Sequence, residues 1–80
     1  MQTIFIQVKC ELGKAYDVAD KAVEQVSQVS EIHSTSGNYD LLIKCHLDDG
    51  TDLGHFVTQH IHTLPGIKDT FTIITFKAFT

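Results

Sequence analysis

The feature that most constrains the fold is a change in the spacing of apolar residues near the start of the chain. Within residues 2–10 apolar side chains recur at every second position, whereas from Ala15 to Val26 they recur at spacings of three and four. A period of two is typical of a strand with one buried face, and a period near 3.6 is typical of an amphipathic helix. The chain therefore begins with a strand followed by a helix. The apolar row of the strand consists of Ile4, Ile6, Val8 and Cys10, and that of the helix of Ala15, Val18, Ala19, Ala22, Val23 and Val26.

Shorter patterns predict four further elements. The turn at residues 48–51 offers side chains that could cap the next helix, and Pro65-Gly66 stops that helix. The first of the remaining strands is polar, which suits the edge of a sheet. In chain order, the predicted elements are a weak strand at residues 28–36, a strand at 39–47, a helix at 53–64 and a strand at 70–79.

The order strand, helix, strand, strand, helix, strand predicts an α+β, ferredoxin-like βαββαβ fold. Its sheet would have four antiparallel strands, with both helices on one face. Eighty residues form one domain, residues 1–80. A chain of this size buries only about 60–65% of the surface that its unfolded form exposes, so packing against a second copy would help it.

The face of the sheet that the helices leave open is predicted to be apolar as well. Since a contiguous apolar patch usually marks an interface, we expect two copies to pack sheet against sheet as a dimeric α/β sandwich. The residues predicted for this interface are Phe5, Leu42, Ile74, Phe76 and Ala78.

Residues 36–40, with the sequence Ser-Gly-Asn-Tyr-Asp, form a tight connection between two predicted strands. Gly37 and Asn38 tolerate the positive φ that a short hairpin requires. Their backbone N–H groups could receive the carboxylate of a free amino acid, while Asp40 could accept from its ammonium group and Tyr39 could cover its apolar side. A second interpretation stays open, in which Gly37 and Asn38 only make the turn and Asp40 bonds a nearby amide.

Three stretches together resemble the ligand-sensing domain of the Lrp/AsnC family. Residues 36–43 resemble the family's hairpin of glycine, aromatic residue, aspartate and aliphatic residues. Residues 64–67, Leu-Pro-Gly-Ile, resemble the Leu-Pro-Gly-Val that closes its second helix, and residues 69–74 resemble the Thr-x-Thr-x-Ile run that opens its last strand. The likeness extends over nearly the whole chain without an evident gap.

The resemblance implies dimers formed through the sheets, which assemble further into rings, often octamers. Amino acids bind between neighbouring dimers in this family, near the hairpin. Full-length members are similar in carrying a helix-turn-helix ahead of this domain, and here the first strand starts at the beginning of the chain. We therefore expect a stand-alone sensing domain without its own DNA-binding part, with a full-length regulator of the same family as a further partner. The implied ligand-binding residues are Gly37, Asn38, Tyr39, Asp40, Thr70 and Thr72.

Composition excludes several other classes of function. A net charge of −4 and six dispersed basic residues argue against direct binding of nucleic acid. No apolar stretch is long enough to span a membrane and no secretion signal is visible, which predicts a cytoplasmic protein with Cys10 and Cys45 reduced in the core. The spacing of the histidines and cysteines fits no metal site, and no catalytic motif occurs, so we expect neither a cofactor nor an enzyme.

Two alternatives share the same order of elements. One is an ACT-like regulatory module, which would bind amino acids at sheets placed edge to edge and would need a glycine-rich connection after the first strand, where only Gly13 stands. The other is a dimeric α/β-barrel enzyme, a small monooxygenase or isomerase, which would need a polar pocket between the sheet and the helices. Fold alone does not decide among these functions.

Overall fold

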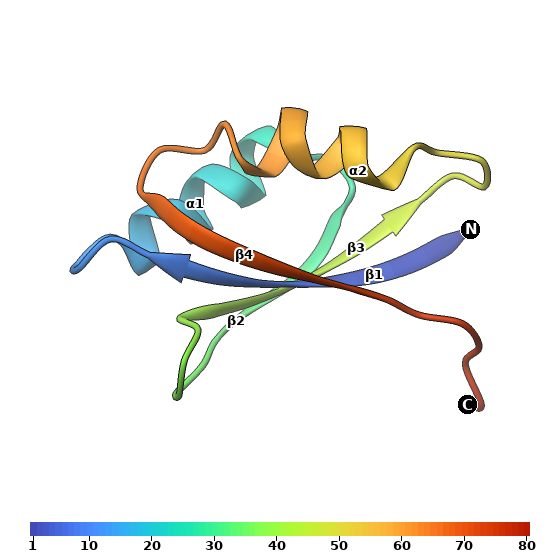
Figure 1. Cartoon of the computed structure of the whole chain (residues 1–80), viewed down its shortest axis with the longest axis horizontal. Helices are drawn as coiled ribbons and strands as arrows, with labels where there is room; N and C mark the ends of the chain where they lie inside the picture. The colour runs from blue at the N-terminus through green and yellow to red at the C-terminus, as the bar shows by residue number, and fades with distance from the viewer.

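A twisted four-stranded antiparallel sheet carries both helices on one face in the computed structural model, which describes residues 1–80 (Figure 1). The strand order β2-β3-β1-β4 places β1 and β3 in the centre and β2 and β4 at the edges. The predicted α+β, ferredoxin-like arrangement is confirmed. The elements are β1 (Gln2–Cys10), α1 (Ala15–Gln25), β2 (Val29–Ser34), β3 (Leu41–Leu47), α2 (Leu53–Phe56), the π-helical turn η1 (Val57–Ile61) and β4 (Ile67–Ile74).

The core lies between the helices and one face of the two central strands. Two adjacent rows of apolar side chains from β1 and β3 meet the inner faces of α1 and η1 there, and no polar side chain is buried. Val23 was predicted to belong to the helix stripe but is 67% exposed, because it lies five positions after the buried Val18 and is rotated by about 140° from it. The most deeply buried members are Ile4, Ile6, Val8, Val18, Leu41, Ile43, Cys45 and Ile61.

The second helical segment begins at Leu53 and changes character after one turn. Its N-terminal cap is Asp52, whose Oδ1 accepts from the backbone N–H of His55 at 3.0 Å. The cap was predicted within the 48–51 turn, so that prediction is wrong by one residue. The backbone N–H of His62 donates to the carbonyl of Val57, five residues earlier, which is the hydrogen bond of a π-helix. The apolar side chains of this segment face the core, since Phe56, Val57, Ile61 and Leu64 are buried and Leu53 is partly buried against them.

The last strand differs most from its prediction, because β4 spans Ile67–Ile74 and not residues 70–79. Its pairing with β1 ends at Ile4 opposite Ile74, so the chain leaves the sheet beyond that point. Two of the predicted interface residues, Phe76 and Ala78, therefore lie outside the sheet. Their alternation resembles a strand, but the ladder with β1 ends at the Ile4–Ile74 pair, so neither residue is paired with a strand.

The register also decides which residues of β4 face the helices. Residues paired across an antiparallel ladder point to the same side. Ile74 pairs with the buried Ile4, so the prediction that Ile74 belongs to the helix-free face is wrong. Phe71 and Ile73, paired with Gln7 and Phe5, occupy that face instead. Leu42 pairs with Gln7 and joins them, as predicted.

Candidate functional site

The connection between β2 and β3 is a closed hairpin at one end of the sheet. The backbone N–H of Thr35 donates to the carbonyl of Asp40 at 2.9 Å, and the Thr35 hydroxyl donates to the carbonyl of Tyr39 at 3.0 Å. Gly37 has a φ of +99°, as the turn prediction requires, whereas Asn38 keeps a negative φ. Gly37 is therefore the residue of this turn whose backbone conformation favours glycine.

Asp40 anchors this hairpin to the end of β1. Its backbone N–H donates to the carbonyl of Val8 at 2.8 Å, and its carboxylate Oδ2 accepts from the backbone N–H of Cys10 at 2.8 Å. The residue therefore bonds a nearby amide, which is the second of the two interpretations of the sequence. Oδ1 has no hydrogen-bond partner within the chain, and a carboxylate has about four acceptor positions. Asp40 can hold the hairpin and still receive a further donor.

A hollow of about 480 Å³ lies between the hairpin and the loop that joins β1 to α1. Its lining combines two basic residues, Lys9 and Lys68, with two acidic residues, Glu11 and Asp40. Lys9 Nζ also donates to the carbonyl of Asn38 at 3.3 Å, which holds its charge at the hairpin. Both signs of charge are therefore present at one site. The remaining lining residues are Cys10, Leu12, Gly13, Ala15, Gly37 and Asn38.

Sequence reasoning missed Lys9, Glu11 and Lys68 as members of this hollow. The signal was present in the order of strands, because an antiparallel β1–β4 pair brings the end of β1 beside the start of β4. The observed pairing of Lys9 with Asp69 shows this neighbourhood directly.

Tyr39 lies on the other side of the hairpin, towards the helix-free face. Its ring centroid is 6.4 Å from that of Phe71. A second hollow of about 480 Å³ opens there and is lined by Gln7, Thr35, Ser36, Asn38, Tyr39 and Leu42. The hairpin therefore separates a charged hollow from one that adjoins the open face of the sheet, and Asn38 lines both.

Thr70 and Thr72 are not close to the hairpin hollows within one chain. Both lie on the helix-facing side of β4, paired with Val8 and Ile6. The Thr70 hydroxyl is hydrogen bonded to His62 Nε2 at 2.8 Å. The two threonines line a separate, mostly apolar hollow of about 300 Å³ beside α2 and η1. A single chain thus places the six predicted ligand residues at three separate hollows.

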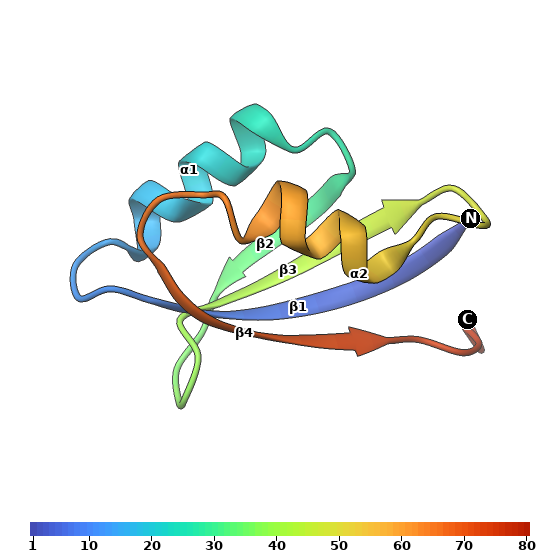
Figure 2. The ribbon, with the colours of Figure 1, turned by 45° about the horizontal axis from the view of Figure 1, so that its top comes forward.

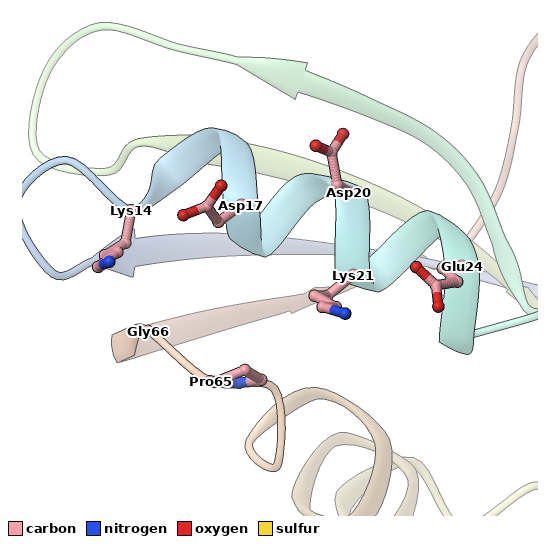
Figure 3. A pocket seen from close by; sticks show the side chains of 7 residues that line it. All are labelled: Lys14, Asp17, Asp20, Lys21, Glu24, Pro65 and Gly66. Atoms are coloured by element: carbon pink, nitrogen blue, oxygen red, sulfur yellow. The ribbon is translucent and has the colours of Figure 1, made fainter.

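The Leu-Pro-Gly stretch has a structural role beside α1. A charged groove of about 500 Å³ lies there. In Figure 3, Lys14 and Lys21 extend towards the Pro65–Gly66 turn and Asp20 points away from it. Gly66 has a φ of +94°, and a Cβ at this position would lie 3.1 Å from Val18 Cγ2. The carbonyl of Gly66 accepts from the backbone N–H of Glu11 at 2.8 Å. The glycine allows the turn to approach α1 closely and to tie the end of β1 to the start of β4.

The two cysteines are free and buried, which confirms their predicted place in the core. Burial raises the pKa of the Cys45 thiol to about 11. Burial, and to a smaller extent the charge of Asp40, also raises the pKa of the Cys10 thiol. Both therefore stay protonated and unreactive at neutral pH. No group of three His, Cys, Asp or Glu side chains could hold a metal ion, and neither helix has the length and apolarity to cross a membrane.

The chain matches the Lrp/AsnC ligand binding domain over residues 3–80 and belongs to that family. It is 32% identical over 73 residues to the HTH-type transcriptional regulator FL11 of Pyrococcus abyssi, a match that covers 91% of this chain and 47% of FL11. The chain thus spans about half the length of FL11 from Pyrococcus abyssi and from two further Pyrococcus species.

Two solved structures extend the comparison. TTHA0845 of Thermus thermophilus is 31% identical, with a TM-score of 0.89, and the match covers 100% of this chain and 99% of that one. The transcriptional regulator NMB0573 of Neisseria meningitidis, solved as a complex with L-Met, is 20% identical with a TM-score of 0.83 over 99% of this chain and 52% of its own, and shows the shared fold alone. Membership of the Lrp/AsnC family favours the predicted resemblance over the ACT-like alternative.

Proposed function

We propose that this chain is a sensor of free amino acids that acts through its own assembly, without catalysis and without a DNA-binding part in the residues present. The observation that carries the proposal is the charged hollow beside the hairpin, which two basic and two acidic residues line in a domain of the Lrp/AsnC ligand-binding family. A free amino acid carries one charge of each sign, so this site matches it better than it matches a simple anion or cation. Its expected place of action is the cytoplasm.

The charges give the ligand one preferred orientation. Lys9 and Lys68 receive the carboxylate, since both lysines line the same hollow. Asp40 accepts from the ligand's ammonium through Oδ1 while Oδ2 keeps its bond to the Cys10 amide. Leu12, which is 99% exposed at the rim, offers an apolar contact to the ligand side chain. This contact favours an amino acid with an aliphatic or thioether side chain.

Assembly completes the site. The helix-free faces of two copies pack together through Phe5, Leu42, Phe71 and Ile73, of which Phe71 and Ile73 are 55% and 40% exposed in one chain. Further association of dimers into a ring brings Thr70 and Thr72 of one dimer towards the hairpin of the next. A ligand held between dimers binds the ring more tightly than the separate dimers, and this difference is what shifts assembly.

The test compares two substitutions of Asp40 by calorimetric titration with a panel of amino acids. Asp40→Asn keeps an oxygen that can accept from the Cys10 amide but removes the charge that pairs with the ligand. We expect it to leave the melting temperature nearly unchanged and to weaken binding by about 10- to 100-fold, as for the loss of a hydrogen bond to a charged group. Asp40→Ala should weaken binding equally and also lower the melting temperature.

Light scattering with and without the amino acids that bind provides the second readout. We expect the average mass to change with the wild-type chain and not with Asp40→Asn at the same ligand concentration. Unchanged affinity in Asp40→Asn would remove Asp40 from the site. A wild-type chain that binds no amino acid of the panel would contradict the proposed function itself.

A further inference from the structure

Residues 75–80, here called the C-terminal arm, lie outside every strand and carry the two most exposed aromatic side chains of the molecule. Phe76 is fully exposed and Phe79 is 87% exposed. The arm is tied to the sheet only at its base, where the Thr75 hydroxyl donates to the carbonyl of Thr3 at 2.5 Å. Within its own chain the arm therefore leaves two large apolar groups in water.

The arm and the β2–β3 hairpin lie at opposite ends of the sheet and project on the same side. Figure 1 shows both segments below the sheet, on the side away from the helices, and Figure 2 shows them again at opposite ends of the molecule. The hydrogen bonds agree with this placement, because the hairpin is held to Val8 near the end of β1 and the arm to Thr3 near its beginning.

We propose that the arm of one copy docks in the second hollow at the hairpin of another copy, the one that adjoins the open face of the sheet. Its phenylalanines would then lie against Tyr39 and Leu42. The proposal rests on the sheet-to-sheet dimer proposed above. When a two-fold axis crosses the strands of two stacked sheets, each end of one sheet lies over the opposite end of the other. Each arm then meets the partner's hairpin, and the contact forms twice because the interface is isologous.

The hollow that adjoins the open face fits such an occupant in size and in chemistry. It measures about 480 Å³ and adjoins the open face, where Leu42 and the Tyr39–Phe71 ring pair supply an apolar wall. Thr35, Ser36 and Asn38 supply polar groups at its rim. The arm's backbone has left the β-ladder, and polar groups at the edge of an interface are suited to pair with such N–H and C=O groups.

The same hairpin would then respond to two events. Its outer side faces the charged hollow in which we place the amino acid, and its inner side holds the partner's arm. Asn38, which lines both hollows, is the shared wall. An amino acid that orders the hairpin would therefore strengthen the docking of the arm, and this connects ligand binding to the dimer contact.

The test is a cross-link between two differently labelled copies of the full chain. Thr80→Cys, which keeps both phenylalanines, and Ser36→Cys are prepared separately, mixed to allow exchange and oxidised; the native Cys10 and Cys45 are buried and serve as internal background. We expect a covalent heterodimer from the mixture and none from either variant alone or mixed with wild type. A chain that carries both substitutions should give a dimer bridged twice.

Other products overturn the proposal. A Thr80→Cys variant that cross-links to itself would mean that like ends of the two sheets meet. A doubly substituted chain that closes into an internal disulfide as a monomer would mean that the arm folds back on its own sheet. The Thr80→Cys and Asp49→Cys pair is the matched control, since Asp49 forms an ion pair with the N-terminus at the arm's own end of the sheet and should not react.

Removal of residues 76–80 gives a second readout. Since these residues belong to no strand, the melting temperature measured at concentrations where the chain is monomeric should stay the same, while the dimer dissociation constant from sedimentation should rise by about 100-fold. A wild-type dimer that this truncation leaves equally tight would refute the docked arm but keep the sheet-to-sheet dimer. A wild-type chain that is monomeric would refute the dimer and the docked arm together.

Discussion

The two faces of the sheet come from the same strands and differ in what covers them. On one face, Ile6 and Ile43 are completely buried beneath the helices. On the other, Phe71 and Ile73 remain about half exposed although they are as apolar. Alternation along a strand supplies both rows at once, but a chain with two helices on one side can cover only one of them. The first row stabilises the folded chain, and the second is available for association.

The open face also carries charge at one margin. Glu31 of the edge strand β2 accepts hydrogen bonds from His33 at 3.1 Å and from Lys44 at 3.3 Å, and all three residues lie on this face. The helix-covered face contains no buried polar side chain. An apolar centre beside a charged margin is the usual composition of an interface, whereas the covered face has the composition of a core.

The largest expected effect is on the free energy of unfolding, when a large apolar side chain is truncated to alanine on one face or on the other. Ile43→Ala should lower the free energy of unfolding by about 2–5 kcal/mol, because it leaves a cavity in a fully buried row. Phe71→Ala, on the other face, should change the stability of the monomer by only about 0.5 kcal/mol. Urea unfolding at low protein concentration measures both. Equal losses would mean that the two faces do not differ as described.

The second effect concerns neighbouring positions of β4. Ile73→Lys places a charge in the open face and should weaken dimerisation by about 100-fold or more, since an unpaired charge would be buried on association. Ile74→Lys is the matched control, because Ile74 points to the helix side and is already 52% exposed. Sedimentation equilibrium should show dimers for Ile74→Lys and monomers for Ile73→Lys. The reverse result would restore the face first predicted for Ile74.

The third effect compares two glycines with positive φ. Gly66→Ala combines backbone strain with a Cβ placed 3.1 Å from Val18, so it should cost about 2–3 kcal/mol of stability. Gly37→Ala has a similar φ but open space around it, and should cost only about 1 kcal/mol. Thermal unfolding of the two variants makes the comparison. If Gly37→Ala lost more stability than Gly66→Ala, close packing of the Pro65–Gly66 turn on α1 would not explain why residue 66 is a glycine.

The smallest effect is the pH response of the charged margin. Hydrogen bonds from His33 first and Lys44 second lower the pKa of Glu31 below its ordinary value of 4.5. Since the folded pKa is the lower one, this contribution to stability is present above pH 4.5 and is lost as the pH falls through the folded value. In an NMR titration of the Ile73→Lys monomer, His33→Ala and Lys44→Met should each raise the Glu31 pKa. Lys44→Arg, which keeps a donor, should leave it low.

Local patterns were sufficient for the parts of the molecule whose neighbours are close in sequence. The alternation of residues 2–10 predicted β1 with its observed bounds, and the spacing of three and four predicted α1 to within one residue. Residues 53–64 were predicted as one helix, and the change to a π-helical turn after Phe56 left no recognisable signal in the sequence. Periodicity reports which side of an element is apolar and does not report its exact winding.

The residues of the candidate site could be predicted only in part from local patterns. The hairpin residues Gly37 to Asp40 were predicted, and three of them line the charged hollow together. Lys9 and Lys68 were missed, because their approach depends on β1 and β4 lying side by side although these are the first and the last strands of the chain. Asp40's bond to the Cys10 amide likewise joins positions that no local pattern connects.

The sequence by itself determined the order of the elements, the fold class that this order predicts and the presence of apolar residues on both sides of the sheet, because each of these depends on periodicity within short segments. The tertiary structure alone decided that Ile73 and not Ile74 faces outward, that the last strand ends at Ile74 and that both signs of charge meet beside the hairpin. These depend on the register between strands distant in sequence, and a shift of one residue in that register moves every side chain of a strand to the other face.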